Sequence, residues 1–192
     1  MKKLKILAIT CSLVTLAMVA PALAGKGKLV AQENSQEVDS QGWKDFHSVS
    51  GKCTLKFPSQ PEHISEKMSV PEEGYDLKYD AYVSTQDKKS IYMLLIAEYP
   101  PFVDQSLAQV SLEGFLNGIL ANNPSNQLLY ADLLLVDGQQ ALDFFIRTGG
   151  VYFKGRAIMV KNQLYLMAME CEVQSYNEGS YNYFVTSFKF GN

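Results

Sequence analysis

The chain has 192 residues, of which 47% are hydrophobic and 19% charged, a globular composition that excludes wholesale disorder. This length suits one domain with a substantial core. The 17 Lys and Arg against 20 Asp and Glu give a formal net charge of −3. An acidic chain lacks the basic footprint that nucleic acids and anionic lipids require, so we expect neither as a partner. The 11 Tyr and 10 Phe favour strands over long helices.

Residues 1–24 have the three parts of a secretory signal peptide. Three lysines form a positive start, residues 6–20 run apolar, and residues 22–24 (Ala-Leu-Ala) supply a small-x-small cleavage site. The apolar run of roughly 15 residues is shorter than the ~20 that span a bilayer, which favours a cleaved signal over a membrane anchor. We therefore expect an exported protein, periplasmic or secreted, whose mature chain has no transmembrane segment.

Residues 25–41 are polar, without aromatic residues or periodicity, which is typical of a flexible linker. We expect a single α/β domain to follow, over residues 42–192. Near its start, residues 51–58 alternate apolar and polar side chains and predict a strand. Residues 62–69 and 75–84 are weaker strand candidates.

A central strand and one helix come next in the chain. Residues 91–99 form a nearly continuous apolar run, as expected for a strand buried on both faces. Residues 111–122 repeat apolar side chains at i, i+3, i+4, i+7 and i+8, which predicts a helix with one apolar stripe. Either Ser106 or Ser111 can cap the start of this helix.

The second half of the domain predicts a meander of four strands. Three dipeptides suit two-residue hairpin loops, namely Asp137-Gly138, Gly149-Gly150 and Lys161-Asn162. These loops pair Val136 with Gln139, Thr148 with Val151, and Val160 with Gln163. One sheet face then collects Leu129, Leu133, Leu142, Phe144, Ile146, Phe153, Ala157, Met159, Leu164 and Leu166. Because three independent turns place apolar side chains on the same face, they support one register.

Helical spacing of apolar side chains returns at residues 181–190, which predicts a short C-terminal helix with a frayed or extended tail. An aromatic cluster lies in and just before it: Tyr176, Tyr181, Tyr183 and Phe184. Tyrosine is common at recognition surfaces because it combines apolar area with a polar tip. The alternative, which we favour, is that the cluster docks the helix on the sheet.

The order of elements is strands, one helix, four strands and one helix. This order predicts an α+β fold with a mainly antiparallel β-sheet flanked by helices.

Several short motifs have a familiar arrangement. The domain opens with Trp43-x-x-Phe46 and then Gly51-x-Cys53-x-Leu55-x-Phe57-Pro58-x-x-Pro61. Later motifs are Tyr99-Pro100, Gly138-x-x-Ala141, Leu164-Tyr165-x-Met167 and Phe184-x-x-Ser187-Phe188. Over about residues 43–190 this pattern resembles bacterial domains with a PsbP-like fold.

The resemblance implies an α-β-α sandwich. The group includes the photosystem II extrinsic subunit PsbP, DcrB-like bacterial lipoproteins and a nuclear Ran-binding protein. It implies roles that are mostly binding and assembly rather than catalysis, although a fold alone does not transfer function.

Motifs for catalysis and metal binding are missing from the sequence. The chain has no G-x-S-x-G, phosphate loop or H-E-x-x-H, and His47 and His63 have no partner at metal-ligand spacing. We therefore expect no enzyme, cofactor or metal. Cys53 and Cys171 lie in apolar alternating strands and form either one disulfide or two buried thiols.

The predicted register brings a candidate binding site together on the face opposite the apolar set. Asp132 lies across from Asp143, and Asp143 lies across from Arg156. Opposed carboxylates repel unless a proton is shared or a cation lies between them, and Arg156 is placed to be that cation. Tyr130 pairs with Phe145 beside them. The cluster is either a solvated ion pair worth ~0–1 kcal/mol or a polar-aromatic groove that recognises a small ligand or a partner segment.

From these observations we expect an exported, non-enzymatic binding or assembly protein that acts through a sheet or loop surface. The alternative hypothesis is a carrier of a small apolar or lipid ligand, held between the helix at 111–122 and the sheet. An enzyme is the least favoured class.

Overall fold

The computed structural model describes residues 42–70 and 75–191. The predicted signal peptide at 1–24, the predicted linker at 25–41 and the predicted turn at 71–74 lie outside the described residues. Within the described part, no helix has the length and apolar character needed to cross a membrane.

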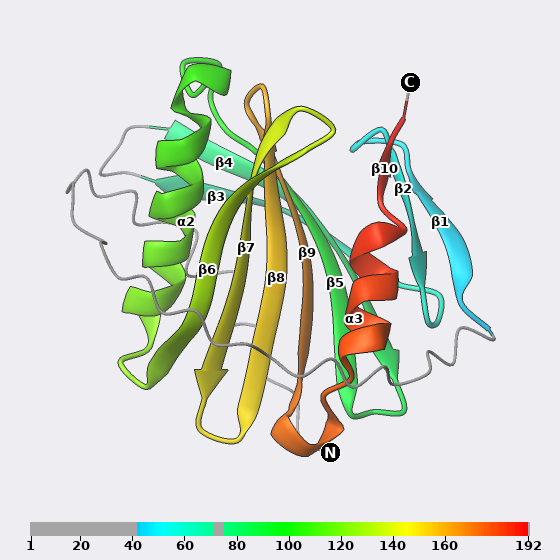
Figure 1. Ribbon diagram of the computed structural model, residues 1–192. Coiled ribbons are helices and arrows are strands. Elements are labelled where there is room, and N and C mark those ends of the chain that lie inside the picture. The colour runs from blue at the N-terminus through cyan, green and yellow to red at the C-terminus, as the bar shows by residue number, and fades with distance from the viewer. Residues whose placement is uncertain (1–41, 71–74, 192) are drawn as a thin grey trace.

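A seven-stranded antiparallel sheet forms the centre of the fold (Figure 1). Its strands are β3 (Glu62–Val70), β4 (Tyr75–Gln86), β5 (Ser90–Glu98), β6 (Asn126–Val136), β7 (Gln139–Thr148), β8 (Val151–Val160) and β9 (Gln163–Glu172). Their order across the sheet is β3-β4-β5-β9-β8-β7-β6. Every residue of β5 except Glu98 is buried, which confirms the predicted central strand.

A smaller sheet joins the two ends of the described chain. It contains β1 (Lys44–Ser48), β2 (Cys53–Phe57) and β10 (Lys189–Phe190), in the order β1-β2-β10. The buried residues of β2 alternate with half-buried ones, as the predicted strand at 51–58 requires. In Figure 1 this sheet lies beside the C-terminal helix α3 (Glu178–Thr186).

The helix predicted at 111–122 is present as α2 (Ala108–Asn122), but neither predicted serine caps it. A short 3-10 helix, η2 (Gln105–Leu107), leads directly into α2, and Asp104 caps η2 by accepting a hydrogen bond from Ser106 N at 2.8 Å. Ser111 is buried within α2. The helix thus begins earlier than predicted: Ala108 is buried four residues before Leu112 and continues the apolar stripe by one turn.

The predicted hairpin register is confirmed. All three predicted pairs are found next to the turns: Val136 with Gln139, Thr148 with Val151, and Val160 with Gln163. The first residue of each turn has a positive φ, 50° at Asp137, 58° at Gly149 and 54° at Lys161, as in primed hairpin turns.

The apolar face departs from the prediction only on β6. The ladder between β6 and β7 shifts between Leu128 and Tyr130, and Leu129 lies in this bulge. Leu129 is 43% exposed and Leu133 is 42% exposed, because β6 is an edge strand. The other members of the predicted set are buried in one core with α2.

The two faces of the sheet support two separate cores. Along β8, Ala157 and Met159 belong to the core under α2, while Ile158 belongs to the core under α3 and the small sheet. This alternation follows from the twofold period of a strand. The result is an α+β sandwich with the main sheet between the two helical layers.

Cys53 and Cys171 are both free and buried, so the disulfide alternative is wrong and the chain has two buried thiols. Burial raises the pKa of Cys53 to about 12. It raises the pKa of Cys171 to about 11, with a smaller contribution from Glu170. At neutral pH both side chains therefore remain protonated and behave as small apolar groups.

Candidate functional site

The predicted ion pair lies on neighbouring strands β7 and β8. Arg156 donates from Nε to Asp143 Oδ1 at 2.6 Å and from Nη2 to Oδ2 at 2.7 Å. The Arg156 and Asp143 side chains are only 22% and 21% exposed. The hydrogen bonds to Asp143 raise the pKa of Arg156, although burial opposes them. A bidentate, part-buried pair holds its two side chains in one geometry, whereas a freely solvated pair does not.

Asp132 is the remaining charge of the predicted cluster. It lies opposite Asp143 in the ladder, on the edge strand β6, and its side chain is exposed. Because Arg156 binds Asp143 with both ends of its guanidinium fork, the charge of Asp143 is compensated. No Lys or Arg of the described residues forms an ion pair with Asp132, so its charge faces solvent.

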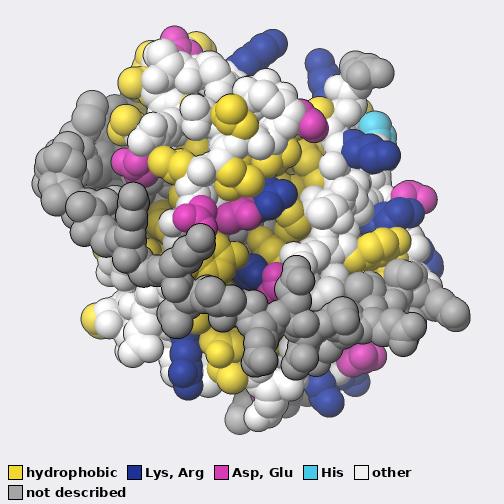
Figure 2. Space-filling model, viewed as in Figure 1, with side chains coloured by type: hydrophobic (Ala, Val, Ile, Leu, Met, Phe, Trp, Pro, Cys, Tyr) yellow, Lys and Arg dark blue, Asp and Glu magenta, His cyan; other side chains and the backbone are white. Residues whose placement is uncertain are grey.

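Aromatic rings line the same face. Tyr130 contacts Phe145 edge to face, with ring centroids 6.0 Å apart. Phe145 also contacts Tyr152 at 4.8 Å and stacks on Tyr176 at 5.2 Å. The five predicted site residues thus share one face of β6–β8. Figure 2 shows acidic and basic side chains together among hydrophobic ones over these strands.

A buried lysine that is absent from the predicted site extends it. The Lys154 side chain, on β8, is 6% exposed, and its Nζ donates to both carboxylate oxygens of Glu178 at 2.7 Å. It also donates to the Tyr176 hydroxyl at 2.9 Å. In the predicted register Lys154 falls opposite Phe145, beside the predicted site. The register alone therefore places Lys154 next to the site. Its partner Glu178 lies on α3, which the register of the strands does not position.

Aromatic rings surround the Lys154 ammonium. Its Nζ lies 4.6 Å from the ring centroid of Tyr181, 5.2 Å from that of Phe145, and 5.7 Å from those of Tyr130 and Tyr176. The face of an aromatic ring attracts a cation, whereas Tyr176 meets the ammonium through its hydroxyl. The carboxylate and the rings together hold the charge in a fixed position.

The predicted aromatic cluster therefore divides between two roles. Phe184 is fully buried and packs with Trp43 and Tyr92, as expected for a helix that docks on the sheet. Tyr183 contacts Trp43 as well. Tyr181, in contrast, faces the Lys154 ammonium.

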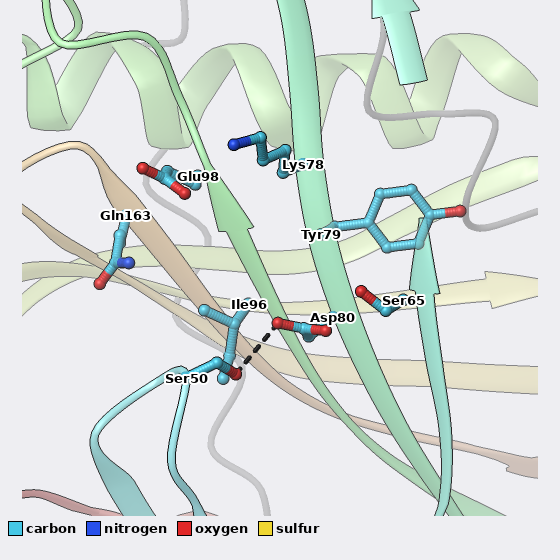
Figure 3. A pocket seen from close by; sticks show the side chains of 8 residues that line it. All are labelled: Ser50, Ser65, Lys78, Tyr79, Asp80, Ile96, Glu98 and Gln163. Carbon is cyan, nitrogen blue, oxygen red and sulfur yellow. Dashed lines mark hydrogen bonds between the residues drawn. The ribbon is translucent and has the colours of Figure 1, made fainter. Parts of the chain in front are cut away.

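A polar hollow of about 150 Å³ lies apart from this site, where the loop before β2 meets the main sheet (Figure 3). It is lined by Ser50, Ser65, Lys78, Tyr79, Asp80, Ile96, Glu98 and Gln163. Asp80 accepts hydrogen bonds from Ser50 Oγ at 3.0 Å and bonds to His63 Nε2 at 2.8 Å. Burial alone raises the pKa of Asp80, but the hydrogen bonds from His63, Ser65 and Ser50 bring it below its ordinary value.

This hollow does not have the arrangement of a hydrolase triad. Nucleophilic serine catalysis needs the imidazole between the hydroxyl and the carboxylate. Here the Asp80 carboxylate lies between Ser50 and His63, so His63 has no direct path to the serine proton. The His63 ring stacks on Tyr82 at 4.5 Å. Among the described residues, no three His, Cys, Asp or Glu side chains are placed to hold a metal ion.

Comparisons with known proteins bear on the fold. No protein-family model matches the sequence, and no curated protein matches it. The solution structure of cyanobacterial PsbP (CyanoP) from Synechocystis sp. PCC 6803 is similar, with a TM-score of 0.56 and 12% identity. The match covers 85% of this chain and 99% of that one.

Two further solved structures are more distant. A protein of Bacteroides thetaiotaomicron VPI-5482 has a TM-score of 0.44 and 10% identity, over 79% of this chain and 50% of that one. A Pseudomonas aeruginosa protein of unknown function has a TM-score of 0.34 and 10% identity, over 69% and 84%. The sandwich described above and its similarity to CyanoP agree with the motif resemblance: the protein has a PsbP-like fold.

Proposed function

We propose that this protein is an exported, non-enzymatic binding or assembly protein that uses the face of β6–β8 for recognition. The observation that carries the proposal is the fixed polar-aromatic surface around the Asp143–Arg156 pair. Such surfaces, with aromatic rings and arginine among compensated charges, are typical of protein interfaces.

Two features of this surface favour recognition over catalysis. The charged groups of Arg156 and Lys154 are already paired with carboxylates of the same protein, which fixes their positions on the surface. The rings of Tyr130 and Phe145 are held by neighbouring rings, which lowers the entropy lost when a partner binds.

The packing under α2 supports a surface rather than an internal ligand site. Leu112, Phe115 and Ile119 of α2 are buried in one continuous core with the sheet. A Cβ atom on Gly155 would lie 2.6 Å from the Phe144 ring, so this core is closely packed. Export is supported by the signal-peptide pattern of residues 1–24.

The proposal is tested by placing a photocrosslinking benzoylphenylalanine at Tyr130 in cells that produce the protein. The matched control places it at Lys44, an exposed residue of β1 in the small sheet. We expect a discrete protein adduct from position 130 and none from position 44. Equal adducts from both positions, or none from either, would contradict the proposal, and an adduct with lipid would favour the carrier alternative.

A further inference from the structure

β6 is an edge strand with an unusually apolar outer rim. It pairs with β7 on one side, and no strand of the described part of the chain pairs with its other side. Its 11 residues contain a single charged side chain, Asp132. Four exposed leucines lie along it: Leu128 at 36%, Leu129 at 43%, Leu133 at 42% and Leu135 at 65%. A long apolar edge is a template for another strand.

The opposite edge of the same sheet is protected in the usual way. β3 begins with Glu62, His63, Ile64, Ser65, Glu66 and Lys67. Charged side chains along an edge discourage pairing with another chain. An unprotected edge is therefore specific to β6 in this sheet, which indicates that β6 has a partner.

The hairpin geometry indicates which backbone groups of β6 are available. Val136 and Gln139 flank a two-residue turn, and such residues form a hydrogen-bonded pair. In an antiparallel ladder the direction of bonding alternates, so Ala131, Leu133 and Leu135 direct their N–H and C=O groups away from β7.

The bulge sets the length of the edge that can receive a strand. The ladder is irregular between Leu128 and Tyr130 and regular from Tyr130 to Val136. Bulges twist an edge and interrupt pairing. The regular segment Tyr130–Val136 is thus the part that suits strand addition.

A strand added there meets two different faces. On one face, Leu133 and Leu135 extend the apolar core beyond the cover of α2. On the other face, the exposed Asp132 lies next to Asp143, whose charge Arg156 already compensates. The unmatched negative charge favours a basic side chain directly opposite Asp132.

We propose that β6 receives an extended segment of a partner protein by strand addition along Tyr130–Val136. The segment carries Lys or Arg opposite Asp132, with apolar residues immediately before and after it that meet the leucine face. This inference rests on the proposed function, since it names the partner chemistry of the same surface. A second copy of this acidic chain suits the edge less well, because it adds another uncompensated Asp132 instead of a cation.

The test uses a fluorescently labelled, capped peptide, Thr-Val-Arg-Val-Thr, with Thr-Val-Glu-Val-Thr as its matched control. We expect the Arg peptide to bind the purified protein, with amide shift changes in NMR spectra confined to β6 and the strand beside it. Asp132→Asn should weaken binding about threefold to fivefold, the usual size of one exposed charge pair. Asp132→Lys should reverse the preference and favour the Glu peptide.

Two variants separate strand addition from other kinds of binding. Leu133→Pro removes an outward N–H but no bond to β7, so it should abolish peptide binding in a folded protein. If the proline variant does not fold, Leu135→Lys replaces it in the test. A charged side chain on the edge discourages strand addition, so this variant should also lose peptide binding.

Three results would overturn the inference: no binding of the Arg peptide, binding unchanged by Asp132→Asn and either edge variant, or a concentration-dependent dimer that the edge variants abolish. Crosslinking from Tyr130 that persists in Leu133→Pro would leave the proposed function standing while strand addition fails.

Discussion

Lys154 shows how a charge can be buried in the face of a sheet at low cost. Its ammonium has two carboxylate oxygens and the Tyr176 hydroxyl as neighbours, together with the rings of Tyr130, Phe145 and Tyr181. An ion pair of this kind adds little to stability compared with apolar side chains, but removal of one partner leaves a buried charge uncompensated. A substitution of one partner therefore destabilises the protein through the buried charge of the other partner.

Glu178→Gln tests this at the scale of one residue. Glu178 itself is 45% exposed, but its partner Lys154 is not, so the variant should lower the free energy of unfolding by about 1–3 kcal/mol. Urea denaturation followed by circular dichroism measures the change.

The matched control is Glu113→Gln, which changes an exposed carboxylate on α2 that accepts a hydrogen bond from Gln109. This substitution should stay within about 0.5 kcal/mol of the original protein. Equal effects of the two substitutions would show that the Lys154 pair is no different from a surface contact.

At the scale of elements, β7, β8 and α2 meet at a glycine. Gly155 of β8 lies opposite Phe144 of β7 in the ladder. The Phe144 ring crosses over this glycine and contacts Phe115 of α2. A side chain at position 155 would occupy the same space as the ring, since its Cβ atom would lie 2.6 Å from Phe144 Cζ and 2.9 Å from Cε1.

Gly155→Ala should therefore destabilise the protein by about 1–3 kcal/mol, the cost of overpacking a core. Gly150→Ala is the control, because a Cβ atom there meets nothing within 4 Å. Thermal and urea unfolding of the two variants measure the difference. A Gly155→Ala variant as stable as Gly150→Ala would mean that the Phe144 ring moves aside freely.

The sequence predicted the meander and the candidate site because both depend on local turns. A two-residue turn fixes the register of a whole hairpin, so Asp137-Gly138 alone places Asp132 opposite Asp143. The bulge at Leu129 changes only the strand's first residues. It left no mark in the sequence, because Leu128, Leu129 and Tyr130 are three successive residues with large apolar side chains, and such a run is compatible with either register.

Contacts between distant elements could not be predicted in this way. β1 and β10 are short and pair with β2 from the two ends of the domain, so no local pattern specifies them. The contact between Lys154 and Glu178 depends on how α3 docks on the sheet. Side-chain partners across layers follow from the assembled fold, whereas strand partners follow from the turns.

At the scale of the whole molecule, one carboxylate connects the two sheets. Asp80 of β4 bonds to His63 of β3 within the main sheet, and it accepts a hydrogen bond from Ser50, in the turn between β1 and β2 of the small sheet. Ser48 donates to the Tyr82 hydroxyl close by. The position of the small sheet therefore depends partly on an ionised side chain.

Acid should weaken this connection. The pKa of Asp80 is lower in the folded protein than its ordinary value of 3.8, so the folded state binds the Asp80 proton less tightly than the unfolded state does. Its stabilising contribution is complete above about pH 4 and is lost as the pH falls through the folded value. The free energy of unfolding should thus fall more steeply below pH 4 in the original protein than in Asp80→Asn.

Comparison with Asp80→Asn isolates this group. Burial raises the pKa of Glu170, so the contribution of Glu170 to stability falls as the pH rises, opposite to that of Asp80. This contribution is the same in both proteins and cancels in the comparison. Urea denaturation at a series of pH values, with a spectroscopic probe at Trp43 beside the small sheet, measures the difference. Parallel curves for the two proteins would show that Asp80 is not ionised differently on folding, and that its charge does not help to hold the two sheets together.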